Sequence, residues 1–466
     1  MPPIARSDRR SSPGPVLVGG IAIVALYVAL LFIVMDRGTW DQWGGMLVLP
    51  VLVLISLPMF ARQARREGDP RVFWILLAFL AVKMLASTFR YLHAFHISES
   101  GSDARQYDGQ ATEIALRFLD GDYTTGLSGL TESNWMRFFT ALIYTALRPS
   151  VLAASYVYAW LAFVGTYGFY RAFVLAVPDG DHRSYGRWLF LMPSVLFWPS
   201  SIGKEAWMMF GLGIAAFGAA KVFRERMIPG VVICAAGLGL AAIVRVPFAA
   251  AMGVGFVVAG VIRSRESRAG RRRLPFSRLA SLAVFAGVSL VLISSMGEYL
   301  ARSGLSGLSV DEIIVTSTDT TGQGGSEFDP SPITNPLTAV VGTVTVLFRP
   351  FITEANTPEA IGAALEGSVL ALVVLLRWRS FVAAVGAMRR VPYMTFALLY
   401  TGGTIFMLSA VANFGILVRT RTLLFPTFLA LMCFLPSARV RRQRALEERP
   451  ALPEAAETRE PVGASA

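Results

Sequence analysis

Charged residues are scarce in this chain: of its 466 residues, 16% are charged and 54% are hydrophobic. A water-soluble domain carries roughly a quarter of charged residues, so this composition excludes a soluble globular protein. Cysteine is scarce as well, since only Cys234 and Cys433 are present and both lie inside apolar runs. Their spacing matches neither a metal site nor a disulfide framework.

Lysine and histidine are nearly absent, so arginine carries most of the formal net charge of +12. The arginines fall in short clusters between apolar runs, which is typical of loops that face anionic lipid. We therefore expect membrane lipid, and no nucleic acid, as a partner. The chain also has no G-x-S-x-G motif and no Walker loop. These absences argue against a serine hydrolase of that type and against a P-loop NTPase.

Apolar runs of about 18 to 20 residues recur from Pro15 to Pro436, and each is long enough to cross a hydrocarbon core of about 30 Å. They predict an all-α integral membrane protein, a polytopic helical bundle of about 12 transmembrane helices. The predicted spans are 15–35, 44–60, 72–94, 151–170, 185–202, 206–223, 227–244, 247–262, 279–297, 361–376, 392–411 and 422–436.

The arginine clusters alternate with acidic loops along the chain, which predicts the topology by the positive-inside rule. A cytoplasmic segment, 1–14, precedes the transmembrane domain, 15–436, and a disordered cytoplasmic tail, 437–466, follows it. The acidic outer loops are 96–137 and 298–360. Both termini are thus expected in the cytoplasm of a cell whose plasma membrane holds the protein.

Both outer loops are expected to carry short amphipathic helices. Two apolar sets in the first loop recur at helical spacing. The sets are Ala104, Tyr107, Ala111, Ile114, Ala115 and Phe118, and then Trp135, Phe138, Phe139, Leu142, Ile143 and Ala146. They predict two helices that lie on the outer membrane surface, the first capped by Ser102 or Asp103. In the second loop, residues 316–328 are expected to be flexible. The 13 apolar residues of Pro336–Phe348 suit an interfacial or re-entrant segment, although a span stays open.

Five cations lie at the outer ends of predicted spans, where the topology rule disfavours positive charge. They are Lys204, Arg245, Arg349, Arg419 and Arg421. Arginine binds phosphate through a planar fork of donors, so together these cations predict a phosphate or pyrophosphate site. The alternative is that each side chain extends to lipid headgroups or pairs with a neighbouring acid.

Asp103 and Glu205 are the candidate catalytic acids. Asp103 opens the first amphipathic helix, and Tyr107 falls on its face, whereas Asp108 points about 140° away. A carboxylate at this place is suited to act as a general base on an acceptor hydroxyl, or it is an ordinary N-cap. Glu205 either pairs with an arginine or serves as a second acid. Tyr107 and Asp108 are candidate substrate-binding residues.

His93 and His96 are three residues apart, which is a metal-ligand spacing on a helix. No third histidine or cysteine lies near them in the sequence. We therefore predict no metal, and the sequence indicates no cofactor. Lys83 lies in the middle of a predicted span, where a charge needs a partner.

Three segments resemble membrane glycosyltransferases. SDARQYDGQA at 102–111 resembles the first outer loop of the GT-C superfamily. MPSVLFWPSSIGKE at 192–205 resembles a helix–turn–helix region of bacterial polysaccharide-assembly proteins of that class. NFGILVRTR at 413–421 is similar to the last outer turn of such proteins and of O-antigen polymerases. The resemblance implies that Asp103 is the catalytic base and that the late arginines bind a lipid phosphate.

The expected function is therefore transfer of a sugar from a polyprenyl-phosphate donor to a cell-envelope glycan or lipid, at the outer face. A polysaccharide polymerase or ligase that joins pyrophosphate-linked oligosaccharides is an alternative, and it depends more on arginines than on an aspartate. A lipid or solute transporter is a second alternative. Transporters favour repeated halves and helices broken near mid-membrane.

Overall fold

The computed structural model describes residues 14–97, 103–224, 227–266, 309–322 and 326–435, with isolated positions between 287 and 301. Within these residues every element is a helix, and the one β-bridge joins Glu327 to Asn413. The predicted all-α class is confirmed. The predicted span 279–297, most of the predicted N-terminal segment and nearly all of the tail lie outside the described residues.

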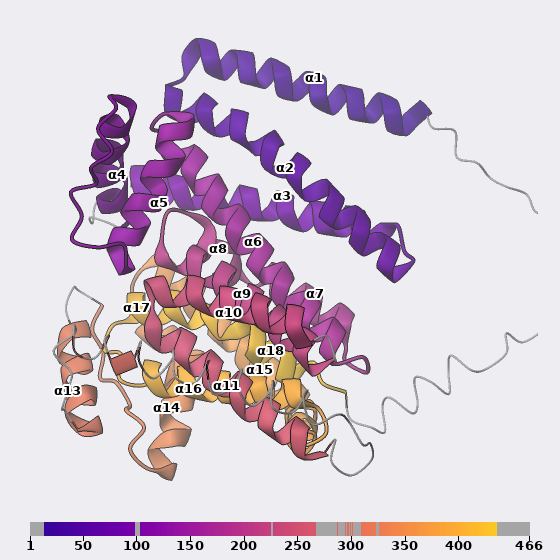
Figure 1. Cartoon of the computed structure of the whole chain (residues 1–466), viewed down its shortest axis with the longest axis vertical. Helices are drawn as coiled ribbons and strands as arrows, with labels where there is room; N and C mark the ends of the chain where they lie inside the picture. The colour runs from indigo at the N-terminus through magenta and orange to yellow at the C-terminus, as the bar shows by residue number, and fades with distance from the viewer. Residues whose placement is uncertain are drawn as a thin grey trace, which may run out of the picture.

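The helices follow one another along the chain as Figure 1 labels them. In order they are α1 Gly14–Arg37, α2 Trp40–Glu67, α3 Arg71–Leu92, η1 His93–Ile97, α4 Asp103–Leu119, α5 Glu132–Leu147, α6 Val151–Ala176, α7 His182–Leu191, α8 Pro193–Phe197, η2 Trp198–Ser200, α9 Lys204–Phe223, α10 Met227–Val244, α11 Val246–Glu266, α13 Val310–Thr321, α14 Pro336–Phe348, η4 Ile352–Glu354, α15 Pro358–Gly386, α16 Pro392–Leu408, α17 Phe414–Thr420, η5 Arg421–Leu423 and α18 Phe425–Met432.

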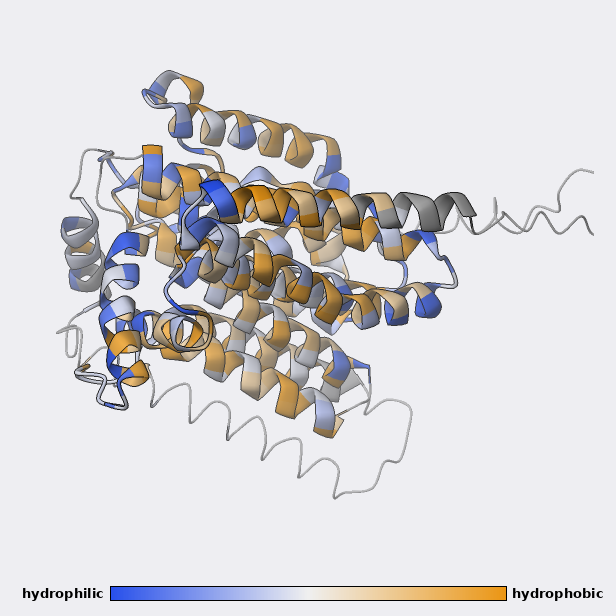
Figure 2. Ribbon diagram, turned by 90° about the horizontal axis from the view of Figure 1, so that it is seen from above, coloured by the Kyte–Doolittle hydropathy of each residue, from blue (hydrophilic) through white to orange (hydrophobic). Residues whose placement is uncertain are grey.

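Six of the described helices are long and apolar enough to span a membrane: α2, α3 with η1, α6, α9, α10 and α15. A seventh candidate is the pair α17 and α18, which is bent by 59°. Figure 2 shows apolar residues along the length of the helices and polar residues gathered toward their ends. The count of about 12 spans is not confirmed and stays a prediction.

One predicted span, 185–202, is wrong as a single helix. The chain there forms α7, the short α8 and the 3-10 turn η2. Pro193 follows the break after α7, and Pro199 lies within η2. Proline lacks an N–H donor and clashes with the preceding helical turn, which explains both interruptions. The start of α9 consequently lies next to a short, broken stretch of helix instead of following a long span.

Buried charges hold both ends of α8. The Lys83 ammonium, from the middle of α3, donates to the backbone carbonyls of Val195 at 2.8 Å and Leu196 at 3.2 Å. Glu366 of α15 accepts from the backbone N–H of Ser194 at 3.1 Å and from its hydroxyl. Backbone groups that a five-residue helix leaves unpaired are thus satisfied by side chains. The partners that the sequence analysis expected for Lys83 are therefore backbone carbonyls and not an acidic side chain.

Helix α9 lies at the centre of the bundle and packs most extensively against α10 and α6. At the α6 contact, a Cβ atom on Gly213 would lie 2.0 Å from the backbone oxygen of Gly165. Only glycine permits two helix backbones to approach this closely. The close packing leaves α9 little freedom to shift, so its first turn is held firmly.

The first loop that was predicted to be outer, 96–137, forms a hairpin of α4 and α5, at the left of Figure 1. All six residues of the predicted α4 face are buried, and they belong to the main hydrophobic core. This face therefore packs on protein, which corrects the expectation of a helix lying on the membrane surface. The predicted α5 face is wrong in part, because Leu142 and Ala146 are exposed while Met136, Ala141 and Tyr144 are buried.

The second outer loop is more ordered than expected. Helix α13 covers the first part of the segment predicted to be flexible, and Ser309 caps it. Beyond it, Ser326 donates to the Asn413 side chain at 3.1 Å, and the Phe328 and Phe414 rings stack with centroids 4.2 Å apart. These contacts tie the loop to the start of α17. Helix α14 forms at Pro336–Phe348, and whether it crosses the membrane stays open.

Candidate functional site

The first turn of α9 carries the two adjacent charges of the predicted site. Gly203 precedes the helix, and Lys204 and Glu205 are its first two residues. Glu205 is only 7% exposed. Burial of an unpaired carboxylate is costly, so Glu205 requires cationic partners within the fold.

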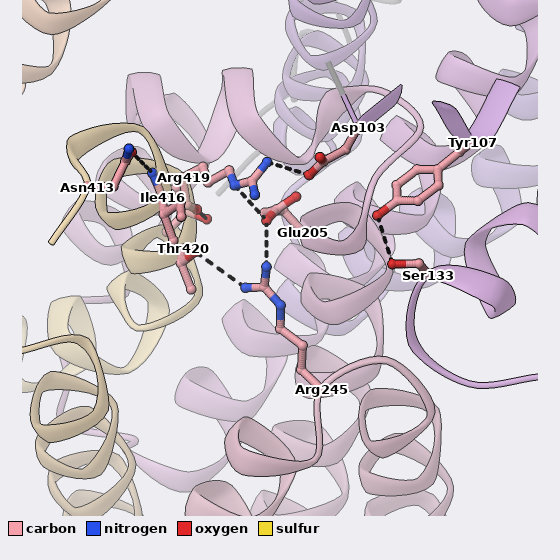
Figure 3. A network of polar contacts seen from close by, with 10 residues as sticks. Asp103, Tyr107, Ser133, Glu205, Arg245, Asn413, Ile416, Arg419 and Thr420 are labelled. Atoms are coloured by element: carbon pink, nitrogen blue, oxygen red, sulfur yellow. Dashed lines mark hydrogen bonds and ion pairs between the residues drawn. The ribbon is translucent and has the colours of Figure 1, made fainter. Parts of the chain in front are cut away.

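Two arginines from distant parts of the chain supply these partners (Figure 3). Arg245, in the break between α10 and α11, places Nη2 at 3.4 Å from Glu205 Oε1 and donates to the Thr420 hydroxyl at 3.3 Å. Arg419, near the end of α17, places Nε at 3.6 Å from the same carboxylate oxygen. Three segments separated by up to two hundred residues therefore meet at one buried acid.

Asp103 completes the cluster from the other side. It is the first residue of α4, and its Oδ2 accepts from Arg419 Nη1 at 2.8 Å. Its side chain is 48% exposed, whereas that of Glu205 is 9% exposed. Arg419 consequently bridges an accessible carboxylate and a buried one, as Figure 3 shows.

A cavity of about 170 Å³ opens beside this cluster. One water occupies about 30 Å³ in the liquid, so the cavity has room for a small polar group with several waters. Its lining consists of Arg90, Asp103, Ala104, Trp198, Ser201, Ile202, Gly203, Lys204, Glu205 and Arg419. Lys204 lines this cavity and makes no hydrogen bond or ion pair within the described residues.

The balance of formal charge at the cavity is positive. Arg90, Lys204 and Arg419 line it together with two carboxylates, and Arg245 pairs with one of these carboxylates from behind. The lining itself carries three cations and two acids, a formal excess of one positive charge. Outside the lining, Arg245 adds a cation beside Glu205, while Glu132 and Glu359 add acids near Lys204 and Arg90. Such a site favours an anion, and arginine forks favour phosphate oxygens in particular.

Sequence reasoning missed two cavity residues, Arg90 and Trp198. The Arg90 guanidinium lies over the Trp198 ring, with Cζ 4.9 Å from its centroid. Arg90 comes in the last turn of α3, at the same end as the outer loops. The signal that selected the other cations, an arginine at the outer end of a span, also applied to it.

Arg349 does not join the cluster, which corrects the expectation of five converging cations. It pairs with Glu354, with Nε 3.0 Å from Oε1, and lies over the Phe328 and Phe414 rings at 4.6 and 5.4 Å. The hydrogen bond from Arg349 lowers the pKa of the Glu354 carboxyl, which lies outside the candidate spans. The positive charge of Arg349 is therefore already neutralised by Glu354.

Arg421 is also absent from the cavity lining, although it is only two residues from Arg419. It is fully buried, and its Nη1 donates to the backbone oxygens of Arg349 and, at 3.4 Å, of Leu347, at the end of α14. Residues two apart on a helix point about 200° apart, so one arginine faces the cavity while the other faces the fold.

Tyr107 and Asp108 do not line the cavity. The Tyr107 hydroxyl lies 3.5 Å from that of Ser133, as Figure 3 shows, and burial raises its pKa. Asp108 accepts from the Tyr144 hydroxyl at 2.6 Å. Burial raises the pKa of the Asp108 carboxyl against the opposing effect of this hydrogen bond. Both residues join α4 to α5, and their contact with substrate stays a prediction.

The His93 and His96 rings have different partners and do not converge on one metal-binding position. His93 contacts Arg90 and Glu359, whereas His96 Nε2 lies 3.1 Å from the Tyr91 hydroxyl. In the described part of the chain, no group of three histidine, cysteine, aspartate or glutamate residues is arranged to hold a metal ion.

Comparison with known proteins finds no matching family model, no similar curated protein and no similar solved structure. The functional argument therefore depends on the geometry of the cavity and on the chemistry of its side chains.

Proposed function

We propose that this chain is a membrane glycosyltransferase that moves a sugar from a polyprenyl-phosphate donor to a cell-envelope glycan or lipid. One observation carries the proposal: an accessible carboxylate, Asp103, is bonded to Arg419 beside a cavity with an excess of positive charge. A base and a phosphate-binding cation at one site are the two groups that glycosyl transfer from a phosphate requires. We place the cavity at the outer face of the plasma membrane, with both termini in the cytoplasm.

In the proposed reaction, an acceptor hydroxyl attacks the anomeric carbon of the donor sugar. Asp103 takes the hydroxyl proton as the new carbon–oxygen bond forms. The bond between the anomeric carbon and the phosphate oxygen breaks, and its electron pair leaves with the phosphate. The products are the glycosylated acceptor and a polyprenyl phosphate.

The charge of the cavity suits this change. A sugar–phosphate diester carries one negative charge, and the departing monophosphate carries two after ionisation. The excess of positive charge in the cavity lining therefore stabilises the leaving group more than the bound donor. Only interactions that strengthen toward the transition state raise the rate of the chemical step. Arg419 and Lys204 are the cations we assign to the leaving phosphate.

Glu205 has a different role from the second acid that the sequence suggested. Its Oε1 lies between Arg245 and Arg419, whose charges stabilise the ionised carboxylate. We therefore assign Glu205 and Arg245 as positioning residues that hold Arg419 at the cavity. Arg419 pairs with Asp103, so a phosphate that binds this arginine also frees the carboxylate to act as a base.

The test is sugar transfer by the purified protein in lipid nanodiscs, with radiolabelled polyprenyl-phosphate sugars as donors. Asp103→Asn keeps a polar side chain of the same size at the start of α4 but removes the base. We expect transfer to fall by about 10²- to 10⁴-fold, the usual contribution of a general base, while thermal stability changes little.

Asp108→Asn is the matched control. It lies on the same helix, and an amide oxygen still accepts from the Tyr144 hydroxyl. We expect this variant to transfer sugar at close to the normal rate. Full activity of Asp103→Asn would refute the assignment of the base.

A polymerase or ligase acting on pyrophosphate-linked oligosaccharides is the second candidate. A pyrophosphate diester carries two negative charges, and the cavity lining holds more cations than acids. Competition separates the two readings. Stronger inhibition by a prenyl pyrophosphate than by a prenyl phosphate, with activity that persists in Asp103→Asn, would favour the polymerase.

The transporter alternative also has an observation in its favour. Helices α7 and α8 are interrupted, α17 and α18 are bent, and two charges lie buried at α8. Broken helices are a feature of transporters. Uptake of a labelled lipid phosphate into proteoliposomes, without covalent turnover, would support this alternative instead.

A further inference from the structure

Arg90 is the one cavity arginine without a carboxylate bonded to it in the described part of the chain. It comes from the last turn of α3, and its guanidinium lies near two aromatic rings that are nearly perpendicular to each other. Cζ is 4.8 Å from the centroid of Phe197 and 4.9 Å from that of Trp198. Aromatic faces attract a guanidinium but leave its N–H donors in the plane free for an anion.

The donors of Arg90 are largely unused. Nη1 makes the only hydrogen bond that this guanidinium forms within the described residues, to His93 Nδ1 at 3.2 Å. Nε is buried without a partner, whereas Nη2 is not fully buried and makes no hydrogen bond within the described residues. The two N–H groups of Nη2 are therefore the donors that an anion in the cavity can reach.

The contact with His93 defines the state of that ring. A guanidinium only donates, so Nδ1 must be the acceptor and carries no proton. The proton is then on Nε2, which donates to Glu359 Oε1 at 2.8 Å. Two hydrogen bonds therefore run in sequence: Arg90 donates to His93 Nδ1, and His93 Nε2 donates to Glu359. His93 begins the π-helical turn η1, and such turns are frequent at functional sites.

We infer that Arg90 is a phosphate ligand of this cavity, beside Arg419 and Lys204, and that His93 and Glu359 are the positioning residues that orient it. The ligand class is a phosphate or pyrophosphate ester, whose oxygens accept from the free face of the guanidinium. This inference rests on the proposed function for the cavity, but it concerns binding and not transfer.

The experiment measures binding to the full-length protein in nanodiscs, using a short-chain prenyl phosphate, the corresponding neutral prenyl alcohol and free inorganic pyrophosphate. The alcohol measures the contribution of the chain alone, and pyrophosphate measures the contribution of the anion alone. Arg90→Gln should weaken binding of prenyl phosphate by about ten- to a hundredfold, the value of one charge-assisted hydrogen bond, and leave the alcohol unaffected.

Arg379→Gln is the matched control. This exposed arginine also lies over an aromatic ring, that of Trp378 at 5.7 Å, but it does not line the cavity. Its replacement should leave binding unchanged. Equal affinities of Arg90→Gln and Arg379→Gln would overturn the role of Arg90.

Two variants of His93 test the positioning role without changing a cavity residue. His93→Phe keeps a ring but removes the acceptor, and it should weaken prenyl phosphate binding several-fold. His93→Asn places an amide oxygen near the position of Nδ1 and should restore most of the affinity. Equal losses in both variants would mean that His93 only supports the local packing.

The outcomes also separate this inference from the proposed function. Binding that depends on Arg90, in a protein that transfers no sugar from any donor, would refute the transferase but support the ligand. Binding that is independent of Arg90, in an active transferase, would refute the ligand alone. A wild-type protein that binds neither prenyl phosphate nor pyrophosphate would refute both.

Discussion

Two ionic clusters lie toward opposite ends of α15, and they differ in how completely their donors are used. At one end, Glu359 is bonded to His93, which in turn contacts Arg90 of the cavity. At the other end, Arg377 pairs with Asp181. The 18 residues between them correspond to about 27 Å of helix.

The Asp181 cluster is closed. Both Nη atoms of Arg377 lie 3.1 Å from Asp181 Oδ2, and Nη2 also donates to Ser184 at 3.0 Å. Asp181 itself caps α7 by accepting from the Ser184 N–H at 3.1 Å. Within the described residues, no buried nitrogen of Arg377 lacks a partner. Such a cluster joins helices and has no capacity left for a ligand.

The cavity cluster is open. Nε of Arg90 and Nε of Arg419 are both buried without a hydrogen bond, and Lys204 has no partner among the described residues. The same residue types are present at both ends, so residue type alone does not identify a site. Unused donors are informative only beside a cavity, because Arg137, Arg171 and Arg421 also bury a side-chain nitrogen without a hydrogen bond and do not line this cavity.

Arg419→Met should have the largest effect, because this residue belongs to the open cluster. We expect prenyl phosphate binding to weaken by about a hundredfold or more, since two charge-assisted hydrogen bonds to the phosphate are lost. Lysine at this position should restore binding only in part, because it lacks the planar fork. Titration in nanodiscs measures both variants.

Two other arginines provide the controls for this prediction. Arg421→Met, two residues away but buried against α14, and Arg377→Met, in the closed cluster, should both bind prenyl phosphate normally once folded. A large loss of affinity in either variant would break the distinction between open and closed clusters.

The second largest effect should be an increase in the free energy of unfolding when prenyl phosphate binds at the open cluster. A ligand present at 100 times its Kd adds about 2.7 kcal/mol to the free energy of unfolding. Thermal unfolding of the wild-type protein with and without prenyl phosphate measures this increase. Arg419→Met should lose it, whereas an Asp181 variant should retain it. Stabilisation that survives in Arg419→Met would place the ligand elsewhere.

Asp181→Ala should act on stability alone. It removes both the cap of α7 and the pair with Arg377, and it should lower the free energy of unfolding by about 1–2 kcal/mol. Asp181→Asn retains a capping side chain and should cost less. Thermal unfolding in detergent reports both losses, and prenyl phosphate affinity should be unchanged. Weaker binding by Asp181→Ala would indicate coupling between the two ends.

The smallest effect should be the loss, at low pH, of the stability that the Asp181–Arg377 pair contributes. Asp181 lies between α6 and α7, outside the candidate spans. Burial raises the pKa of its carboxyl, but the hydrogen bonds from Ser184 and the charge of Arg377 outweigh burial and lower the pKa overall. The stability that the Arg377 pair contributes is therefore fully present above the unfolded pKa of about 3.9 and is lost as pH falls through the folded pKa. The difference in melting temperature between wild type and Asp181→Asn should shrink from pH 6 to pH 3.5. A constant difference would contradict the ionic contribution.

Much of the fold was predictable from local pattern. Apolar runs predicted the helical class, and the spacing of apolar residues predicted all six buried positions of the α4 face. Break positions were harder to predict. The turn at Arg245 was correct, but the proline-interrupted segment of α7 and α8 was expected to be a single span. Hydropathy averages over a window and therefore does not detect a break that one proline causes.

The candidate site divides in the same way. The sequence by itself determined that charged residues lie toward the ends of the apolar runs, because charge is costly at membrane depth. Tertiary structure alone decided which of them share a cavity. Arg419 and Arg421 have the same sequence signal, yet one faces Asp103 and the other is buried against backbone carbonyls. Direction around a helix and pairing across hundreds of residues depend on packing, and Arg90 and Trp198 became candidates only through their neighbours.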